Sequence, residues 1–63
     1  MNNKKYIIQQ LKDSGYIDTM WQENLILNFV ESGIRCGYII SDNEYISQAK
    51  SMITLANAID EKD

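Results

Sequence analysis

Residues 41–60, SDNEYISQAKSMITLANAID, decide the fold of this chain because they carry both the start signal and the apolar pattern of a long helix. Ser41 and Glu44 have the spacing of a capping box, in which the hydroxyl accepts from the amide three residues on and the carboxylate returns the contact. Ile40 and Tyr45 have the spacing of a hydrophobic staple around that cap. The stretch therefore predicts a helix from residue 42 to about residue 60.

The apolar residues of this helix form one stripe, because they recur at steps of three and four residues. Two alanines near the centre of the stripe would let another helix approach closely. We expect the stripe to be packed in the core rather than to form a groove kept for a partner. Its predicted core residues are Tyr45, Ala49, Met52, Ile53, Ala56 and Ile59.

A first, shorter helix is predicted over about residues 3–13. Ile7, Ile8 and Leu11 share its apolar face, and of these Ile7 and Leu11 are predicted core residues. Gly15 follows at the position where a helix commonly ends in a left-handed residue, and Tyr16 is placed to contact Leu11. This spacing predicts a Schellman motif as the end of the helix.

A second helix is predicted over residues 19–32, starting at Asp18 or Thr19, with Gln22 three residues after the threonine. The same end pattern recurs at its far side, where Gly33 would be the left-handed residue and Ile34 would fold back on Phe29. This helix has one broad apolar face, interrupted by Gln22, that is formed by Trp21, Leu25, Ile26, Phe29 and Val30. Three of these residues are predicted core residues: Trp21, Leu25 and Phe29.

Two apolar residues of the second helix lie outside that broad face. A helix that is apolar on more than one side is either central or contacts something else. Two interpretations remain open: these residues contact a second protomer or a partner, or the segment after the helix covers them. On the first interpretation, the predicted interface is Met20, Asn24, Leu27 and Glu31.

Residues 34–40, IRCGYII, are too apolar for an exposed loop and too short for a helix that contains Gly37. We expect an extended segment that lies against the core and buries Ile39 or Ile40. No second strand is evident for it to pair with. The predicted fold is all-α, with three helices (about 3–13, 19–32 and 42–60) in a small bundle, and residues 1–63 form a single domain.

A chain of 63 residues buries only roughly 60% of the surface that its unfolded form exposes. Small domains usually need a disulfide, a metal or a partner chain. Cys36 is the single cysteine and histidine is absent, so neither an intrachain disulfide nor a zinc site of the Cys or Cys/His kind is expected. We therefore expect the chain to form a homodimer, which would bury the additional surface that the monomer leaves exposed.

Most catalytic chemistry is excluded or unsupported by the sequence. Without histidine there is no Ser-His or Cys-His pair, and the three glycines are isolated rather than grouped in a phosphate loop. Paired carboxylates stand at helix ends, where capping explains them. We therefore expect no catalytic, cofactor-binding or metal-binding residues, and no enzymatic activity.

The net charge of −3 is unevenly distributed, with Lys4, Lys5 and Lys12 near the start and four acidic residues between positions 13 and 32. DNA binding normally needs several cations on one face. As a DNA-binding helix, the third helix would present only one cation, Lys50. Only Arg35 and the lysines near the start of the chain could add to it. Nucleic-acid binding is therefore a disfavoured alternative.

The predicted function is that of a small non-enzymatic helical interaction protein, a homodimeric regulator or inhibitor that binds another protein. The alternative is a nucleic-acid-associated helix-turn-helix-like dimer. No apolar run approaches the roughly 20 residues of a membrane span, and the free cysteine favours the cytoplasm. The abundance of Ile, Asn and Lys is typical of an AT-rich coding sequence, which suggests a bacterial or phage origin.

Overall fold

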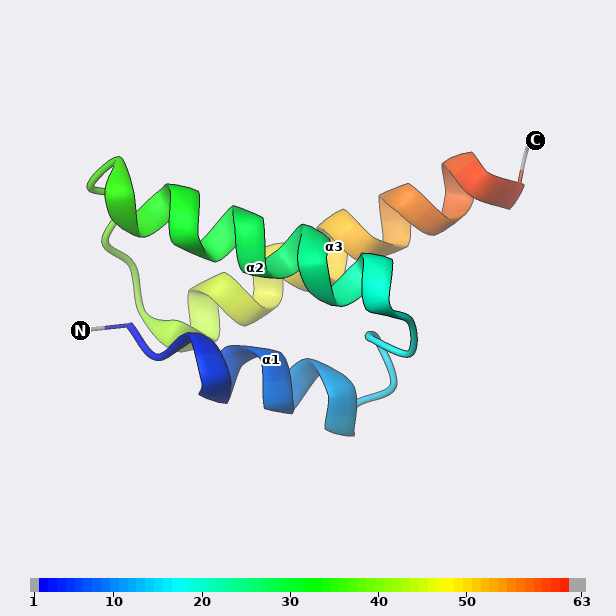
Figure 1. Cartoon of the computed structure of the whole chain (residues 1–63), viewed down its shortest axis with the longest axis horizontal. Helices are drawn as coiled ribbons and strands as arrows, with labels where there is room; N and C mark the ends of the chain where they lie inside the picture. The colour runs from blue at the N-terminus through cyan, green and yellow to red at the C-terminus, as the bar shows by residue number, and fades with distance from the viewer. Residues whose placement is uncertain (1, 62–63) are drawn as a thin grey trace.

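The computed structural model describes residues 2–61, with side chains to residue 59, and these form three helices. They are α1 (Lys4–Asp13), α2 (Met20–Arg35) and α3 (Asp42–Glu61), and no strand occurs among the described residues. Each helix contacts the other two. In Figure 1, α2 runs back above α1, and α3 passes behind both and projects beyond them at its C-terminal end. The all-α three-helix bundle is confirmed.

Two predicted helix starts are confirmed by side-chain caps. The Thr19 hydroxyl accepts from the Gln22 amide, and the Gln22 side-chain oxygen accepts from the Thr19 amide at 3.1 Å, so α2 begins with a complete capping box. The Ser41 hydroxyl accepts from the Glu44 amide at 3.1 Å at the start of α3. The reciprocal contact from the Glu44 carboxylate is not among the hydrogen bonds of the described residues.

The predicted end of α1 is also confirmed. Gly15 adopts the left-handed conformation, with φ of 82°. The Tyr16 amide donates to the Leu11 carbonyl at 2.9 Å, and the Gly15 amide donates to the Lys12 carbonyl at 3.1 Å. These are the two hydrogen bonds of a Schellman motif.

The predicted end of α2 is wrong, because the helix continues through Gly33 to Arg35. Gly37, with φ of 84°, is the left-handed residue that ends it. The Tyr38 amide donates to the Gly33 carbonyl at 2.7 Å, and the Gly37 amide donates to the Ile34 carbonyl at 3.2 Å. The chain therefore uses the second of two available glycines for its Schellman motif.

Gly33 is required for a different reason, which is the close approach of an aromatic ring. A Cβ atom at this position would lie 2.6 Å from the Tyr45 hydroxyl oxygen, closer than real Cβ atoms come to other atoms. The glycine thus makes room within a helix for the first turn of α3. The sequence pattern around it does not distinguish this role from that of a helix end.

The extended segment predicted at residues 34–40 is largely absent. Ile34 and Arg35 belong to α2, so only a short connection up to Ser41 is non-helical and extended. Ile34 is exposed and does not fold back on Phe29, and Ile39 is 81% exposed. Ile40 is half-buried against the core, so of the two residues predicted to be buried in this segment, Ile39 and Ile40, it is Ile40 that packs there.

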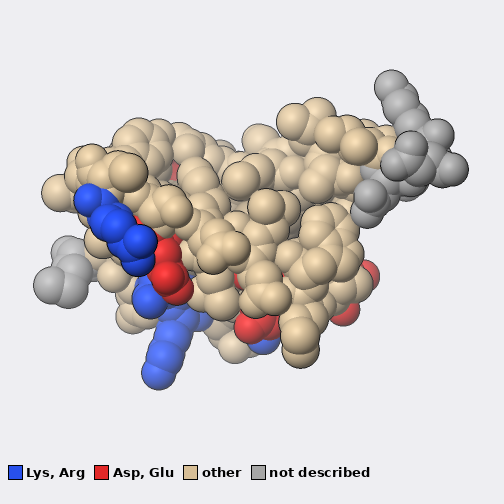
Figure 2. All heavy atoms as spheres, turned by 45° about the horizontal axis from the view of Figure 1, so that its top comes forward, with Lys and Arg blue, Asp and Glu red and all other residues tan. Residues whose placement is uncertain are grey.

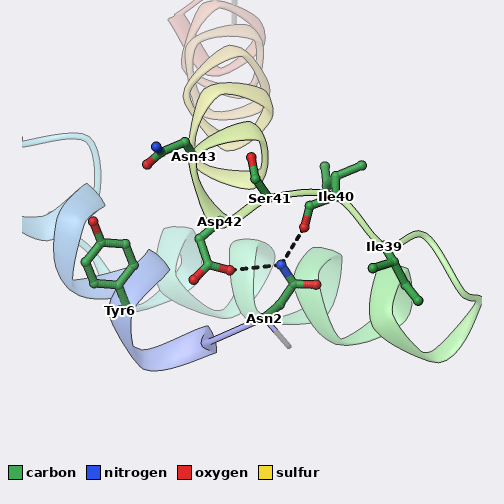
Figure 3. A pocket seen from close by; sticks show the side chains of 7 residues that line it. All are labelled: Asn2, Tyr6, Ile39, Ile40, Ser41, Asp42 and Asn43. Carbon is green, nitrogen blue, oxygen red and sulfur yellow. Dashed lines mark hydrogen bonds between the residues drawn. The ribbon is translucent and has the colours of Figure 1, made fainter.

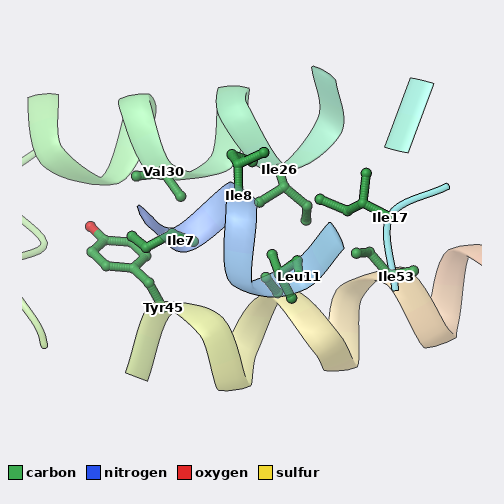
Figure 4. Close-up of a cluster of buried hydrophobic side chains, with 9 residues drawn as sticks. Ile7, Ile8, Leu11, Ile17, Ile26, Val30, Tyr45 and Ile53 are labelled. Carbon is green, nitrogen blue, oxygen red and sulfur yellow. The ribbon is translucent and has the colours of Figure 1, made fainter. Parts of the chain in front are cut away.

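The core lies where the three helices meet (Figure 4), and five of its predicted members are confirmed as buried: Ile7, Leu11, Tyr45, Ala49 and Ile53. Leu25, Phe29 and Met52 are half-buried against it, and Ala56 is also only partly buried. The core is completed by four residues that were not assigned to it, Ile8, Ile17, Ile26 and Val30.

Two predicted core residues, Trp21 and Ile59, are wrong, since both are exposed. The lengths of the helices explain Ile59. At about 1.5 Å per residue, the ten residues of α1 span about 15 Å, whereas the twenty residues of α3 span about 30 Å. The apolar stripe of α3 therefore continues past the end of the bundle that covers it. Trp21 lies at the edge of its helix face, because Gln22, Ile26 and Val30 point to the centre.

Candidate interaction surface

The predicted interface row on α2 does not form one open surface. Met20 is 78% exposed and Asn24 is exposed, but Leu27 is packed against the core. Glu31 pairs with Lys4 of α1 at 3.4 Å, so this row follows the side of α2 that faces α1. The covering element is therefore α1 rather than the segment after α2.

A different surface arises where α2 and α3 pack. The Phe29 ring lies edge-on to Tyr45, with centroids 5.6 Å apart, at one end of the helix pair. At the other end the Gln22 side-chain amide donates to the Asn57 side-chain oxygen at 3.3 Å. Together these two contacts show that α2 and α3 run in opposite directions. The first half of α2 therefore lies alongside the second half of α3.

Helical periodicity places apolar residues along this junction, on the outer side of each helix. Trp21 and Leu25 continue the row of Phe29 on α2, and Met52, Leu55 and Ile59 share a row on α3. Trp21 is 44% exposed, Leu55 is 64% exposed and Ile59 is 59% exposed. We call this surface the α2–α3 face, defined by Trp21, Leu25, Met52, Leu55 and Ile59.

The outer part of the α2–α3 face stands on the projecting end of α3. From Thr54 to Ile59 no residue is buried, although the segment remains helical. In the space-filling view of Figure 2 this end protrudes at the upper right and shows no charged side chain among the described residues. Large exposed apolar side chains grouped on one face are typical of surfaces that bind protein.

Charged residues gather elsewhere, toward one end of the molecule and along its lower edge in Figure 2. Lys12 pairs with Glu23 of α2 at 2.8 Å, in addition to the pair between Lys4 and Glu31. The ammonium of Lys50 lies 5.3 Å from the centre of the Tyr16 ring. Several of the cations that a nucleic-acid site would need are therefore engaged within the chain.

A shallow concavity of about 380 Å³ lies where the N-terminal segment meets the start of α3 (Figure 3). The Asn2 side chain points into it and donates to the Ile40 carbonyl at 2.6 Å and to the Asp42 carboxylate at 2.8 Å. The Asn3 amide donates to the same carboxylate oxygen. Since these polar groups bind one another, their contacts tie the N-terminal segment to the start of α3.

Tyr45 is the most enclosed polar side chain of α3. Its ring is buried between Phe29 and Tyr38, and its hydroxyl donates to the Tyr38 carbonyl at 2.5 Å. Burial raises the pKa of Tyr45 above its ordinary value of 10.0, and the neighbouring Tyr38 phenol raises it further. The group is suited to holding the connection after α2 against α3, not to proton transfer near neutral pH.

This raised pKa predicts a loss of stability at high pH. In the unfolded chain Tyr45 ionises at about 10, whereas the folded state keeps the proton to higher pH. The contribution is fully present below about pH 10 and is lost as the pH rises beyond it. Melting temperatures measured between pH 8 and 11 should therefore fall less steeply above pH 10 in Tyr45→Phe than in the parent or in the exposed-site control Tyr6→Phe. Equal slopes in all three would contradict the assignment.

The described residues hold no group of three or more His, Cys, Asp or Glu side chains that could bind a metal ion. Cys36 is a free, exposed thiol at the end of α2. Over the same part of the chain, none of the helices has the combined length and hydrophobicity that crossing a membrane requires.

The fold and surface define a small all-α protein, a three-helix bundle with an exposed apolar face. Comparisons with protein-family models, with curated proteins and with solved structures each found no match to this chain. Its function is therefore argued from the geometry of its own surfaces.

Proposed function

We propose that this chain is a non-enzymatic protein-binding module, a regulator or inhibitor that acts by covering part of another polypeptide. The observation that carries the proposal is the exposure of the α2–α3 face. Three large apolar side chains, Trp21, Leu55 and Ile59, stand in water on that face. Burying them against a partner would be favourable by roughly 25 cal/mol for each Å² of apolar surface.

Charge favours a protein partner over a nucleic acid. The net charge is −3, and Lys4 and Lys12 are each paired with a glutamate of α2. Phosphate contacts supply most of the affinity in nucleic-acid binding and need free cations. The exposed thiol of Cys36 fits a reducing compartment, so we place the module in the cytoplasm.

The test compares what the parent and two variants bind. Leu55→Glu adds a charge to the α2–α3 face at a position that is mostly exposed, so the monomer should remain folded. Ser47→Glu adds the same charge to α3 at an exposed position that is not three or four residues from any residue of the face. From the lysate of cells that also produce the untagged chain, immobilised parent and Ser47→Glu protein should retain the same polypeptides, and Leu55→Glu should lose them.

Circular dichroism on all three proteins checks that helicity is unchanged. If Leu55→Glu retains the same polypeptides as the parent, the face is not the binding surface and the proposal fails. If the parent retains a nucleic acid through salt-sensitive contacts instead, the function belongs to the basic end of the molecule.

A further inference from the structure

We propose that a second copy of this chain occupies the α2–α3 face, in a two-fold dimer in which the projecting end of each α3 lies against Trp21 and Leu25 of the other protomer. This inference rests on the proposed function, that the face binds protein, and it names the partner. Three observations support the dimer: the α2–α3 face is uncharged, α3 projects beyond the bundle, and a small chain gains from the area that a dimer buries.

The first feature is that the described residues which define the α2–α3 face carry no charge. In a two-fold dimer the same patch meets itself, so any charged residue near the axis would face its own like charge. Two copies of a chain with a net charge of −3 therefore need an uncharged contact surface. The defining residues of the α2–α3 face are all apolar, while the described charged side chains of α2 lie on its α1 side or at its far end.

The second feature is the projection of α3. The six residues from Thr54 to Ile59, none of which is buried, would be marginal as an isolated helix, because short isolated helices are unstable in water. Leu55 and Ile59 continue the apolar stripe of α3 on these turns, so the stripe extends past its intrachain cover. The projecting end of α3 and the exposed ring of Trp21 lie on the same face. In a two-fold dimer the α3 end of each protomer could therefore contact the Trp21 ring of the other.

The third feature is size. The accessible surface of the analysed chain is 4479 Å², and an ordinary stable interface buries about 800 Å² on each partner, roughly a sixth of that surface. A stable dimer through the α2–α3 face would therefore have to bury about that area on each chain. The dimer would also supply the additional burial that a 63-residue domain with a single cysteine lacks.

The experiment measures mass and tryptophan emission on the same samples. Trp21 is the single tryptophan and is 44% exposed, so covering it should shift its emission to shorter wavelength as concentration rises. Light scattering from about 1 to 500 µM should show a monomer that becomes a dimer over the same range. Raising the salt from about 0.05 to 0.5 M should strengthen the dimer, because it screens repulsion between two acidic chains.

Leu55→Glu and Ile59→Glu should each raise the dimer dissociation constant at least about tenfold, and Ser47→Glu should leave it within about twofold. A parent that is monomeric throughout overturns the inference, and so does a dimer unaffected by both face variants. Face-dependent capture of another polypeptide by a monomeric parent would overturn the dimer and retain the proposed function. A dimer that weakens as salt is raised would indicate an ion-paired interface, and this result would also overturn the inference.

Discussion

Ile26→Ala is expected to unfold much of this protein at room temperature. Ile26 is fully buried between the helices, and truncating a buried isoleucine to alanine costs about 2–5 kcal/mol. A domain of this length has a free energy of unfolding of roughly 3–9 kcal/mol, at about 0.05–0.15 kcal/mol per residue. Urea unfolding followed by circular dichroism should show a midpoint shifted to much lower denaturant, or no cooperative transition.

Ile59→Ala is the matched control for this substitution. It removes the same atoms from a side chain that is mostly in water, so it should change the stability of the monomer by no more than about 0.5 kcal/mol. The comparison must be made at low concentration, so that association does not contribute. Equal losses for the two variants would show that the stripe of α3 is covered along its whole length, contrary to this structure.

Gly33→Ala is expected to destabilise the protein although it replaces glycine inside a helix. Alanine in place of glycine usually stabilises a helix interior by about 1 kcal/mol. Here the new methyl group would lie 2.6 Å from the Tyr45 hydroxyl oxygen. The ring cannot move away freely because it is buried and hydrogen-bonded to the Tyr38 carbonyl. Overpacking of this kind costs about 1–3 kcal/mol, which exceeds the gain in helix propensity.

A double-mutant cycle isolates the cause. In a Tyr45→Phe background the hydroxyl is gone, and the nearest ring carbons would lie 3.2 and 3.3 Å from the new Cβ. Gly33→Ala should then be close to neutral or stabilising. Gly37→Ala is the control, since its cost comes from a φ of 84° and should be the same in both backgrounds. A cost of Gly33→Ala that is equally large without the hydroxyl would show that the clash with the Tyr45 hydroxyl is not its cause.

Local signals in the sequence were sufficient wherever neighbouring residues decide the structure. Thr19 with Gln22, and Gly15 with Tyr16, are caps and ends made within five residues, so their spacing alone predicts them. The same holds for Ile7, Leu11, Tyr45, Ala49 and Ile53, which lie at the centres of their helix faces and are buried against any partner helix. Three helices in an all-α bundle follow from these signals.

Other features depended on contacts between distant parts of the chain. Two glycines near the end of α2 could each end the helix, and the choice depends on Tyr45, twelve residues beyond Gly33, which needs the space. The edges of the core likewise depend on which helix lies opposite. Leu27 is covered because it lies on the side of α2 that faces α1. Trp21 remains 44% exposed because it lies at the edge of the α2 face, away from the buried Gln22, Ile26 and Val30.

The sequence by itself determined the helices, their starts, the end of α1 and the central core, because these depend on hydrogen bonds and periodicity over a few residues. Only the tertiary structure decided where the apolar stripe of α3 ceases to be covered. A periodic pattern continues along a helix regardless of its neighbours, whereas burial stops where the shorter helices stop. The exposed Leu55 and Ile59 arise from that difference in length.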